Sequence, residues 1–147
     1  MAAEVTQKAA DVEALVPMLD QVEANTGTRP DKALADAGYR SESNLQALEK
    51  RKIEGFVALG REKSGAPKPV DPELEATGRM ARKMKTQRGQ AHYRKRKYLA
   101  EPPFAWIKSV MGFRSFSLRG VEKVTAEWSL ACLAANLRRM NRLMEWA

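Results

Sequence analysis

Apolar residues recur at helical spacing near the start of the chain and predict an amphipathic helix over residues 7–25 that stops before Gly27. Pro17 falls inside this helix and marks a place where it can kink. A short apolar strand over residues 32–35 follows and ends at Asp36. The chain is therefore expected to open with one helix and one strand.

A second helix is predicted over residues 41–52, "SESNLQALEKRK", because the Ser41 hydroxyl can cap the free N–H groups and the last turn is basic. A second strand is predicted over residues 53–60, "IEGFVALG", which contains two glycines that bound it. Alternation of helices and strands is typical of an α/β layer with at least two parallel strands.

The alternation of predicted helices and strands stops at residues 61–79. This segment is rich in Pro and Gly, a composition that predicts a surface loop. Two helices are predicted after it, over residues 87–98 and 102–111, with Pro102 and Pro103 in the first turn of the second. Missing N–H donors cost nothing in a first turn, so this placement explains both prolines.

The last predicted helix, residues 121–144, is apolar nearly all round in its middle, which predicts a buried packing helix. Its exposed end carries Arg138, Arg139 and Arg142. The expected fold class is therefore α/β, with a short parallel sheet flanked by helices and a helical C-terminal half.

The length and composition of the chain are typical of one soluble globular domain, since its 147 residues are 44% hydrophobic and 30% charged. No window approaches the roughly 20 apolar residues of a membrane span, and the acidic N-terminus lacks the features of a secretory signal. We therefore expect a cytoplasmic protein. The single Cys132 excludes an internal disulfide and a Cys-rich zinc site, and a small core residue is the simplest role for it.

The net charge of +8 is concentrated in the second part of the chain. Residues 1–60 carry 7 Lys/Arg against 10 Asp/Glu, whereas residues 61–147 carry 19 against 8. Residues 79–97 contain nine cations and no acid, a pattern expected for a protein that binds a polyphosphate. A solvated basic face or a disordered arm explains the charge alone equally well.

Common enzyme signatures are absent, including a glycine-rich phosphate loop, HExxH, GxSxG and CxxC. His92 lies among cations and is expected to be a surface residue rather than a general base. Asp36 stands at the C-terminal end of a predicted parallel strand, the edge where α/β sheets bind ligands. An aspartate in an ordinary strand-to-helix turn is the alternative.

Glu101 is the second carboxylate of interest. If the helix around it is continuous, the 3.6-residue period places it within an arc of about 80° that also holds Tyr93, Lys97 and Lys108. A carboxylate between lysines can hold a divalent metal while the lysines hold phosphates. The alternative is an ion-paired surface glutamate.

Two segments, "ADAGYRSESNLQALEKRKIEGFVALGR" and "YRKRKYLAEPPFAWIK" with its continuation through "GFRSFSLRG" to "EWSLACLAANL", carry a family resemblance. In these two segments the chain resembles the C-terminal portion of the DDE transposases of bacterial insertion sequences, which have a ribonuclease H-like catalytic core. The resemblance covers nearly the whole of residues 1–147 and implies that they are the C-terminal part of a catalytic domain, with 61–79 as a loop.

The resemblance implies roles for individual residues. Asp36 and Glu101 would be catalytic and would bind Mg²⁺ or Mn²⁺, and Tyr93 and Lys108 would belong to the family's Tyr-Arg-Glu-Lys signature. The expected DNA-phosphate contacts are made by Tyr93, Arg94, Arg96, Lys97 and Lys108.

The chain departs from the family pattern in two places. Lys97 stands where the signature arginine is expected, and Arg96 lies one residue further back, so either can take that role. The family's first catalytic aspartate lies upstream of a segment like "AAEVT", with which this chain almost begins, while Asp11 and Asp20 fall within the first predicted helix. We therefore expect a truncated, catalytically incomplete form.

Two functions follow from the resemblance. The first is a transposase fragment for metal-dependent phosphodiester cleavage and strand transfer at insertion-sequence ends. The second is a non-catalytic basic DNA-binding remnant or regulator of transposition. The expected partners are DNA at the insertion-sequence ends and the target, and either a second copy or an intact transposase subunit. No membrane association is expected, and the protein is expected at the nucleoid.

Overall fold

The computed structural model describes residues 5, 11–60 and 74–144, which form two compact units. The first unit comprises residues 11–96 and the second residues 97–144, with the boundary inside helix α4. No helix of the described residues is long and apolar enough to cross a membrane.

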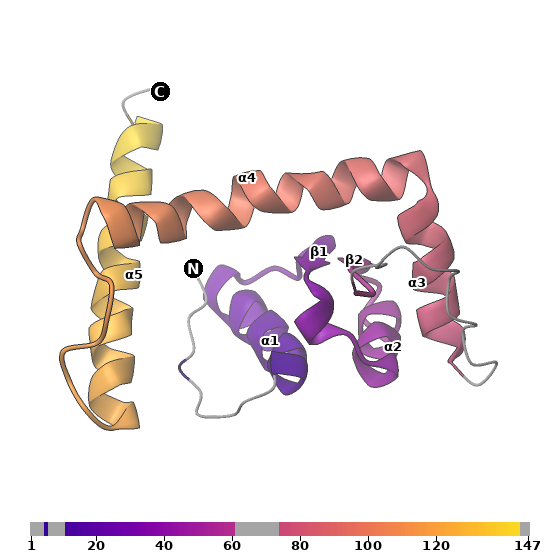
Figure 1. Ribbon diagram of the computed structural model, residues 1–147, viewed down its shortest axis with the longest axis horizontal. Helices are drawn as coiled ribbons and strands as arrows, with labels where there is room; N and C mark the ends of the chain where they lie inside the picture. Colours follow the sequence, from indigo (N-terminus) through magenta and orange to yellow (C-terminus); the bar gives the residue numbers. More distant parts are fainter. Residues whose placement is uncertain (1–4, 6–10, 61–73, 145–147) are drawn as a thin grey trace. The chain divides into compact units, whose positions relative to one another are not determined.

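A two-stranded parallel sheet forms the centre of the first unit (Figure 1). Strand β1 (Lys32–Ala35) pairs with β2 (Glu54–Val57), with Leu34 opposite Phe56. The 3₁₀ helix η2 (Ala37–Tyr39) and helix α2 (Glu42–Lys50) connect the strands. The structure confirms the predicted α/β class, with a second strand shorter than the predicted 53–60.

Helix α1 (Leu15–Thr26) follows a 3₁₀ turn, η1 (Asp11–Ala14). Residues 7–10 of the predicted first helix lie outside the described residues. Pro17 falls in the first turn of α1, where its missing N–H group has no intrahelical acceptor, and the predicted kink site is therefore wrong. Helices α1 and α2, both strands and the next helix contribute to one apolar core, made of Leu15, Leu19, Ala35, Leu45, Leu48, Ile53, Val57, Ala76 and Met80.

Gly55 allows this core to close over β2. A Cβ atom at this position would lie 2.7 Å from Cδ1 of Leu48 and 3.3 Å from Cε of Met80. Any side chain at this position would therefore force the ends of the Leu48 and Met80 side chains to shift.

Helix α3 (Glu75–Lys85) was not predicted from the sequence. Its first turn is held by the Glu42 carboxylate, which accepts hydrogen bonds from the backbone N–H groups of Ala76 at 2.8 Å and Thr77 at 2.9 Å. The predicted loop over 61–79 is shorter at its C-terminal end, because residues 75–79 are helical. Residues 61–73 of that loop lie outside the described residues.

A sharp corner joins α3 to α4 (Gln87–Ser109) at Thr86 (Figure 1). The Thr86 hydroxyl donates to the carbonyl of Lys83 at 2.7 Å and accepts from the N–H of Gly89 at 2.9 Å. A Cβ atom at Gly89 would lie only 2.1 Å from the Lys83 carbonyl oxygen, so the corner requires glycine there.

Helix α4 is continuous from Gln87 to Ser109, and the prediction of two helices over 87–98 and 102–111 is therefore wrong. Pro102 and Pro103 lie inside the helix and leave the carbonyls of Tyr98 and Leu99 without their usual helical donors. The side chains at those two positions are exposed, so water can reach this stretch of backbone.

Helix α5 (Val121–Met144) crosses the C-terminal end of α4 in the second unit (Figure 1). The rings of Phe104, Phe113 and Phe116 surround Trp128 with centroid distances of 6.0, 6.1 and 6.4 Å. Cys132 is buried, which confirms its predicted role as a small core residue.

The prediction that α5 is a buried packing helix is wrong. Among its residues only Ala131 and Cys132 are buried, and Leu130, Leu133, Leu137 and further apolar side chains are exposed. The other described parts of this unit are one helix end and a short link, and they can cover only one side of a helix of 24 residues.

Candidate nucleic-acid interface and metal-binding carboxylates

Asp36 lies directly after β1, at the carboxyl end of the parallel sheet, as predicted. It caps η2 by accepting a hydrogen bond from the N–H of Gly38 at 3.0 Å through Oδ1. Its side chain is 51% exposed, and Oδ2 is therefore open to a further partner. The local turn thus aims one carboxylate oxygen at the backbone and leaves the other for a cation.

Arg96 lies beside this carboxylate, and Tyr93 lies beside Arg96. Nη1 of Arg96 is 4.0 Å from Oδ2 of Asp36, and Cζ of the same guanidinium is 5.7 Å from the centre of the Tyr93 ring. The structure therefore brings together three residues that the sequence singled out, from the end of β1 and from α4.

Asp11 is a second carboxylate near this turn, on η1. Its Oδ2 lies 3.6 Å from the position of a Cβ at Gly38, and Oδ1 of Asp36 lies 3.2 Å from the same point. Burial, together with the charges of Asp11 and Asp36, raises the pKa of the Tyr39 hydroxyl. This proximity was not predictable from local sequence patterns, because helix α1 and strand β1 separate Asp11 from Asp36 in the chain.

Asp20 has a different environment and pairs with Arg51. The hydrogen bond from that guanidinium outweighs burial and holds the pKa of Asp20 below its usual value. Asp20 is therefore occupied in a surface ion pair on α1.

Glu101 lies on α4 in the second unit and is exposed. No hydrogen bond or ion pair joins its side chain to another described residue. Tyr93, Lys97 and Lys108 stand on the same helix as Glu101, because α4 runs from Gln87 to Ser109. Among residues 5, 11–60 and 74–144, no group of three or more His, Cys, Asp or Glu side chains is placed to hold a metal ion.

The basic cluster over residues 79–97 divides into paired and free cations. Four of its members contact carboxylates in the first unit. Arg79 lies 2.7 Å from Glu49, and Lys83 and Arg88 lie 3.4 and 3.1 Å from Glu54. Arg96 is the fourth, through Asp36. These four cations therefore already have carboxylate partners within the first unit.

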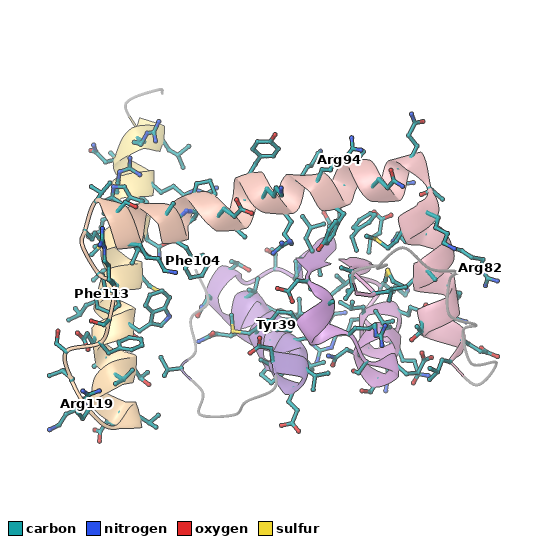
Figure 2. The ribbon with its side chains drawn as sticks, in the orientation of Figure 1. Tyr39, Arg82, Arg94, Phe104, Phe113 and Arg119 are labelled. Carbon is teal, nitrogen blue, oxygen red and sulfur yellow. The ribbon has the colours of Figure 1, made fainter. Side chains whose placement is uncertain are left out.

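The remaining cations have no carboxylate partner among the described residues and are exposed, namely Arg82, Lys85, Arg94, Lys95 and Lys97. Figure 2 shows Arg82 and Arg94 extending outward from α3 and α4. Arg94 and Lys97 are among the predicted phosphate contacts, whereas Arg82 and Lys85 were predicted only as members of the basic cluster. Ala76, Met80 and Met84 recur every four residues, and this spacing was the available signal for a helix there.

His92 was predicted to be a surface residue, but its side chain is half-buried. Its ring stacks on Phe56 with a centroid distance of 4.8 Å, and Nζ of Lys83 lies 4.2 Å from the Phe56 ring centre. Burial and the nearby cations Lys32 and Lys95 lower the pKa of His92. A neutral imidazole therefore helps to cover the second face of β2.

A basic groove lies between α4 and α5 in the second unit, with a volume of about 640 Å³. Tyr98, Pro102 and Trp106 line one wall. The other wall is lined by α5 residues that include Arg138, Arg139 and Arg142. Cζ of Arg138 lies 4.8 Å from the Trp106 ring centre, so a cation–π contact joins the two walls of the groove.

The first unit is thus a βαβ unit with a carboxylate at the carboxyl end of its first strand, the edge where open α/β sheets bind ligands. Residues 1–137 match the family model for the transposase DDE domain. The chain therefore belongs to the DDE transposase family, as its resemblance implied. Searches among curated proteins and among solved structures found no match.

Proposed function

We propose that the chain is the C-terminal part of a transposase catalytic domain that acts on insertion-sequence ends and target DNA. The observation that carries the proposal is Asp36, which stands at the carboxyl end of β1 in an Asp-Ala-Gly-Tyr turn within a chain that matches the transposase DDE domain. Asp36 is the expected catalytic aspartate, and Glu101 on α4 is the expected catalytic glutamate. A DNA-bound protein of this kind would be found at the nucleoid.

Asp36 and Glu101 are the proposed ligands of Mg²⁺ or Mn²⁺. Both are exposed carboxylates, the hard oxygen donors that these cations prefer, and Mg²⁺ keeps several waters when it binds one or two carboxylates. A metal bound there would supply activation of water or of a 3′ hydroxyl and stabilise the leaving oxygen. The assignment is supported by the exposure of both carboxylates and by Oδ2 of Asp36, whose contact is an exposed ion pair with Arg96 at 4.0 Å that a metal ion can displace.

The cations have separate proposed tasks. Arg94, Lys97 and Lys108 are exposed and are proposed to contact DNA phosphates. Arg96 already lies beside Asp36 and over Tyr93, which favours a positioning role close to the carboxylate for this residue. Lys97 then takes the phosphate contact that the signature arginine makes in the family.

We infer that this chain alone cleaves DNA poorly, because two of the three signature carboxylates are matched in it and a third normally bridges the metals. The alternative function is a non-catalytic regulator that binds DNA through its basic surface. The exposed cations on α3 and α4 favour it, since they need no metal to bind phosphates.

Fluorescence anisotropy with a short DNA duplex, at low and moderate salt and with or without Mg²⁺, tests the proposal. The native chain, Asp36→Asn with Glu101→Gln, and the control Glu122→Gln are compared. Glu122 is an exposed carboxylate at the start of α5. Binding that Mg²⁺ strengthens in the native and control chains, but not in the double variant, supports the metal site. Salt-sensitive binding that ignores Mg²⁺ in all three chains supports the regulator instead.

A further inference from the structure

Asn44 is buried in the first unit although its side chain is polar. Only 6% of its surface is exposed, and no other polar or charged residue among residues 5, 11–60 and 74–144 is buried. Removing an amide from water costs free energy unless hydrogen bonds within the protein replace those to water. The partners of this side chain therefore indicate what it does.

The Asn44 side chain donates two hydrogen bonds to the backbone. Its Nδ2 lies 2.6 Å from the carbonyl oxygen of Val12 and 2.9 Å from the carbonyl oxygen of Tyr39. An amide NH₂ group carries two hydrogens, so each carbonyl accepts one of them. Both partners are acceptors, and only the nitrogen end of the amide suits this position.

The two carbonyls belong to the segments that adjoin Asp36 and Asp11. Tyr39 is the last residue of η2, the turn that Asp36 caps, and Val12 follows Asp11 in η1. The segments η1 and η2 lie against each other in the first unit. Asn44 therefore joins the end of the Asp36 turn to the segment packed beside it.

The backbone of Asn44 is itself held in place. It lies in the first turn of α2, where its N–H group donates to Oγ of Ser41 at 3.1 Å. Leu45 and Leu48 of the same helix are each 1% exposed and belong to the apolar core. Because the asparagine side chain is short, its amide cannot move far while α2 stays packed. The core thus sets the position of the amide.

We propose that Asn44 is a positioning residue for Asp36. It fixes the C-terminal end of the turn whose N-terminal end Asp36 caps, so that Oδ1 stays on the Gly38 N–H group and Oδ2 is left for a cation. This inference rests on the proposed function, in which Asp36 binds a metal ion. Loss of a group that orients a metal ligand typically weakens metal binding by roughly tenfold to a hundredfold.

NMR spectra of the full chain without metal give the first test. Asn44→Leu keeps a side chain of similar shape and removes both donors, whereas Leu45→Val changes the buried neighbour on α2 and keeps the amide. We expect the Gly38 amide proton signal to shift in Asn44→Leu, because the turn loses its anchor, and to stay in place in Leu45→Val. An unchanged Gly38 signal in folded Asn44→Leu overturns the proposal.

Titration of the same three chains with Mn²⁺ gives the second test, since the paramagnetic ion broadens signals of nearby protons. The Mn²⁺ concentration that half-broadens the Gly38 signal should rise at least about tenfold in Asn44→Leu. Leu45→Val should resemble the native chain, although it also alters the core. Equal concentrations in Asn44→Leu and the native chain overturn a positioning role, and an equal rise in both variants reduces Asn44 to a general contribution to stability.

Hydrogen exchange of the native chain tests the same contact and does not depend on any variant folding. The two side-chain amide protons of Asn44 should exchange with solvent much more slowly than those of Asn25, an exposed asparagine on α1. Exchange as fast as that of Asn25 would show that the amide does not hold the two carbonyls, and the proposal would fail.

These measurements separate the positioning role from the proposed function. A native chain in which Mn²⁺ leaves the Gly38 signal sharp rejects Asp36 as a metal ligand, while the metal-free spectra and the exchange rates still decide whether Asn44 anchors the turn. A native chain that binds Mn²⁺ beside Gly38, with Asn44→Leu unchanged, retains the metal site and rejects the role of Asn44.

Discussion

Nη1 of Arg96 lies 4.0 Å from Oδ2 of Asp36, the carboxylate oxygen that the Gly38 N–H group does not use. A metal ion bound by Asp36 would therefore lie close to the positive charge of Arg96. The two cations compete for one oxygen, and this competition gives the first prediction.

Replacing Arg96 with Gln should strengthen Mg²⁺ binding at Asp36. Both side chains are partly exposed, so solvent screens the ion pair and the gain should be below about 1 kcal/mol, which is less than tenfold in affinity. Titration of the chain with Mg²⁺, followed by NMR shifts of the Ala37–Tyr39 turn, measures it. Arg94→Gln on the same helix is the matched control, and an equal gain there would refute direct competition.

Arg94→Ala should reduce the salt dependence of DNA binding. Arg94 is exposed and has no carboxylate partner among the described residues, so its loss should lower the slope of log affinity against log salt by about 0.9. Arg88 lies on the same helix but pairs with Glu54 at 3.1 Å. Arg88→Ala should therefore change the slope less, and anisotropy titrations over a salt series compare the two. Equal changes would contradict the division into paired and free cations.

Glu42→Gln should lower the thermal midpoint of the first unit at neutral pH. Burial opposes ionisation of Glu42, but hydrogen bonds from Thr77 and from the N–H groups of Ala76 and Thr77 outweigh it and lower the pKa to about 2. Glutamine keeps one acceptor oxygen and loses the charge that suits the first turn of α3.

The same residue predicts a pH dependence. Because the folded pKa of Glu42 lies below the unfolded value of 4.5, its stabilisation is complete above pH 4.5 and is lost as the pH falls through about 2. Urea unfolding followed by circular dichroism should therefore show a difference between the native chain and Glu42→Gln at pH 7 that shrinks towards pH 2. A difference that is constant with pH would show that charge is not the cause.

Gly89→Ala should destabilise the corner between α3 and α4. The new Cβ would overlap the Lys83 carbonyl oxygen, and backbone rather than a flexible side chain must move to relieve the overlap. We expect a loss of at least about 2 kcal/mol in the free energy of unfolding. Gln87→Ala, at the exposed start of α4, is the control and should be nearly neutral or slightly stabilising.

Local signals in the sequence predicted much of the first unit. Ser41 caps α2 by accepting from the Asn44 N–H group, and β1 ends at Asp36, because both features depend on neighbouring residues. The start of helix α3 was not predictable locally, because Glu42, which holds its first turn, lies 34 residues before Ala76. The continuity of α4 through Pro102 and Pro103 was also missed, because a proline removes a helical hydrogen bond and clashes with the preceding turn, which predicts a new helix start at that point.

The sequence predicted which residues belong to the candidate site, but not which of them contact one another. The family motif identified Asp36 and Glu101, yet nothing in the sequence showed that Arg96 pairs with Asp36 while Arg94 stays free. That difference arises from the rotation of α4 against the first unit's sheet edge. For α5 the apolar pattern was read correctly, but its exposure depends on which other segments are available to cover it.

The aromatic cluster around Trp128 has a spectroscopic consequence. All three tryptophans of the chain follow residue 96, at positions 106, 128 and 146, so the first unit contains none. Tryptophan emission therefore reports on the second unit alone, whereas circular dichroism reports on the helices of both. If the two signals change at different denaturant concentrations, the units unfold as separate cooperative blocks, and each can be studied within the intact chain without being cut from it.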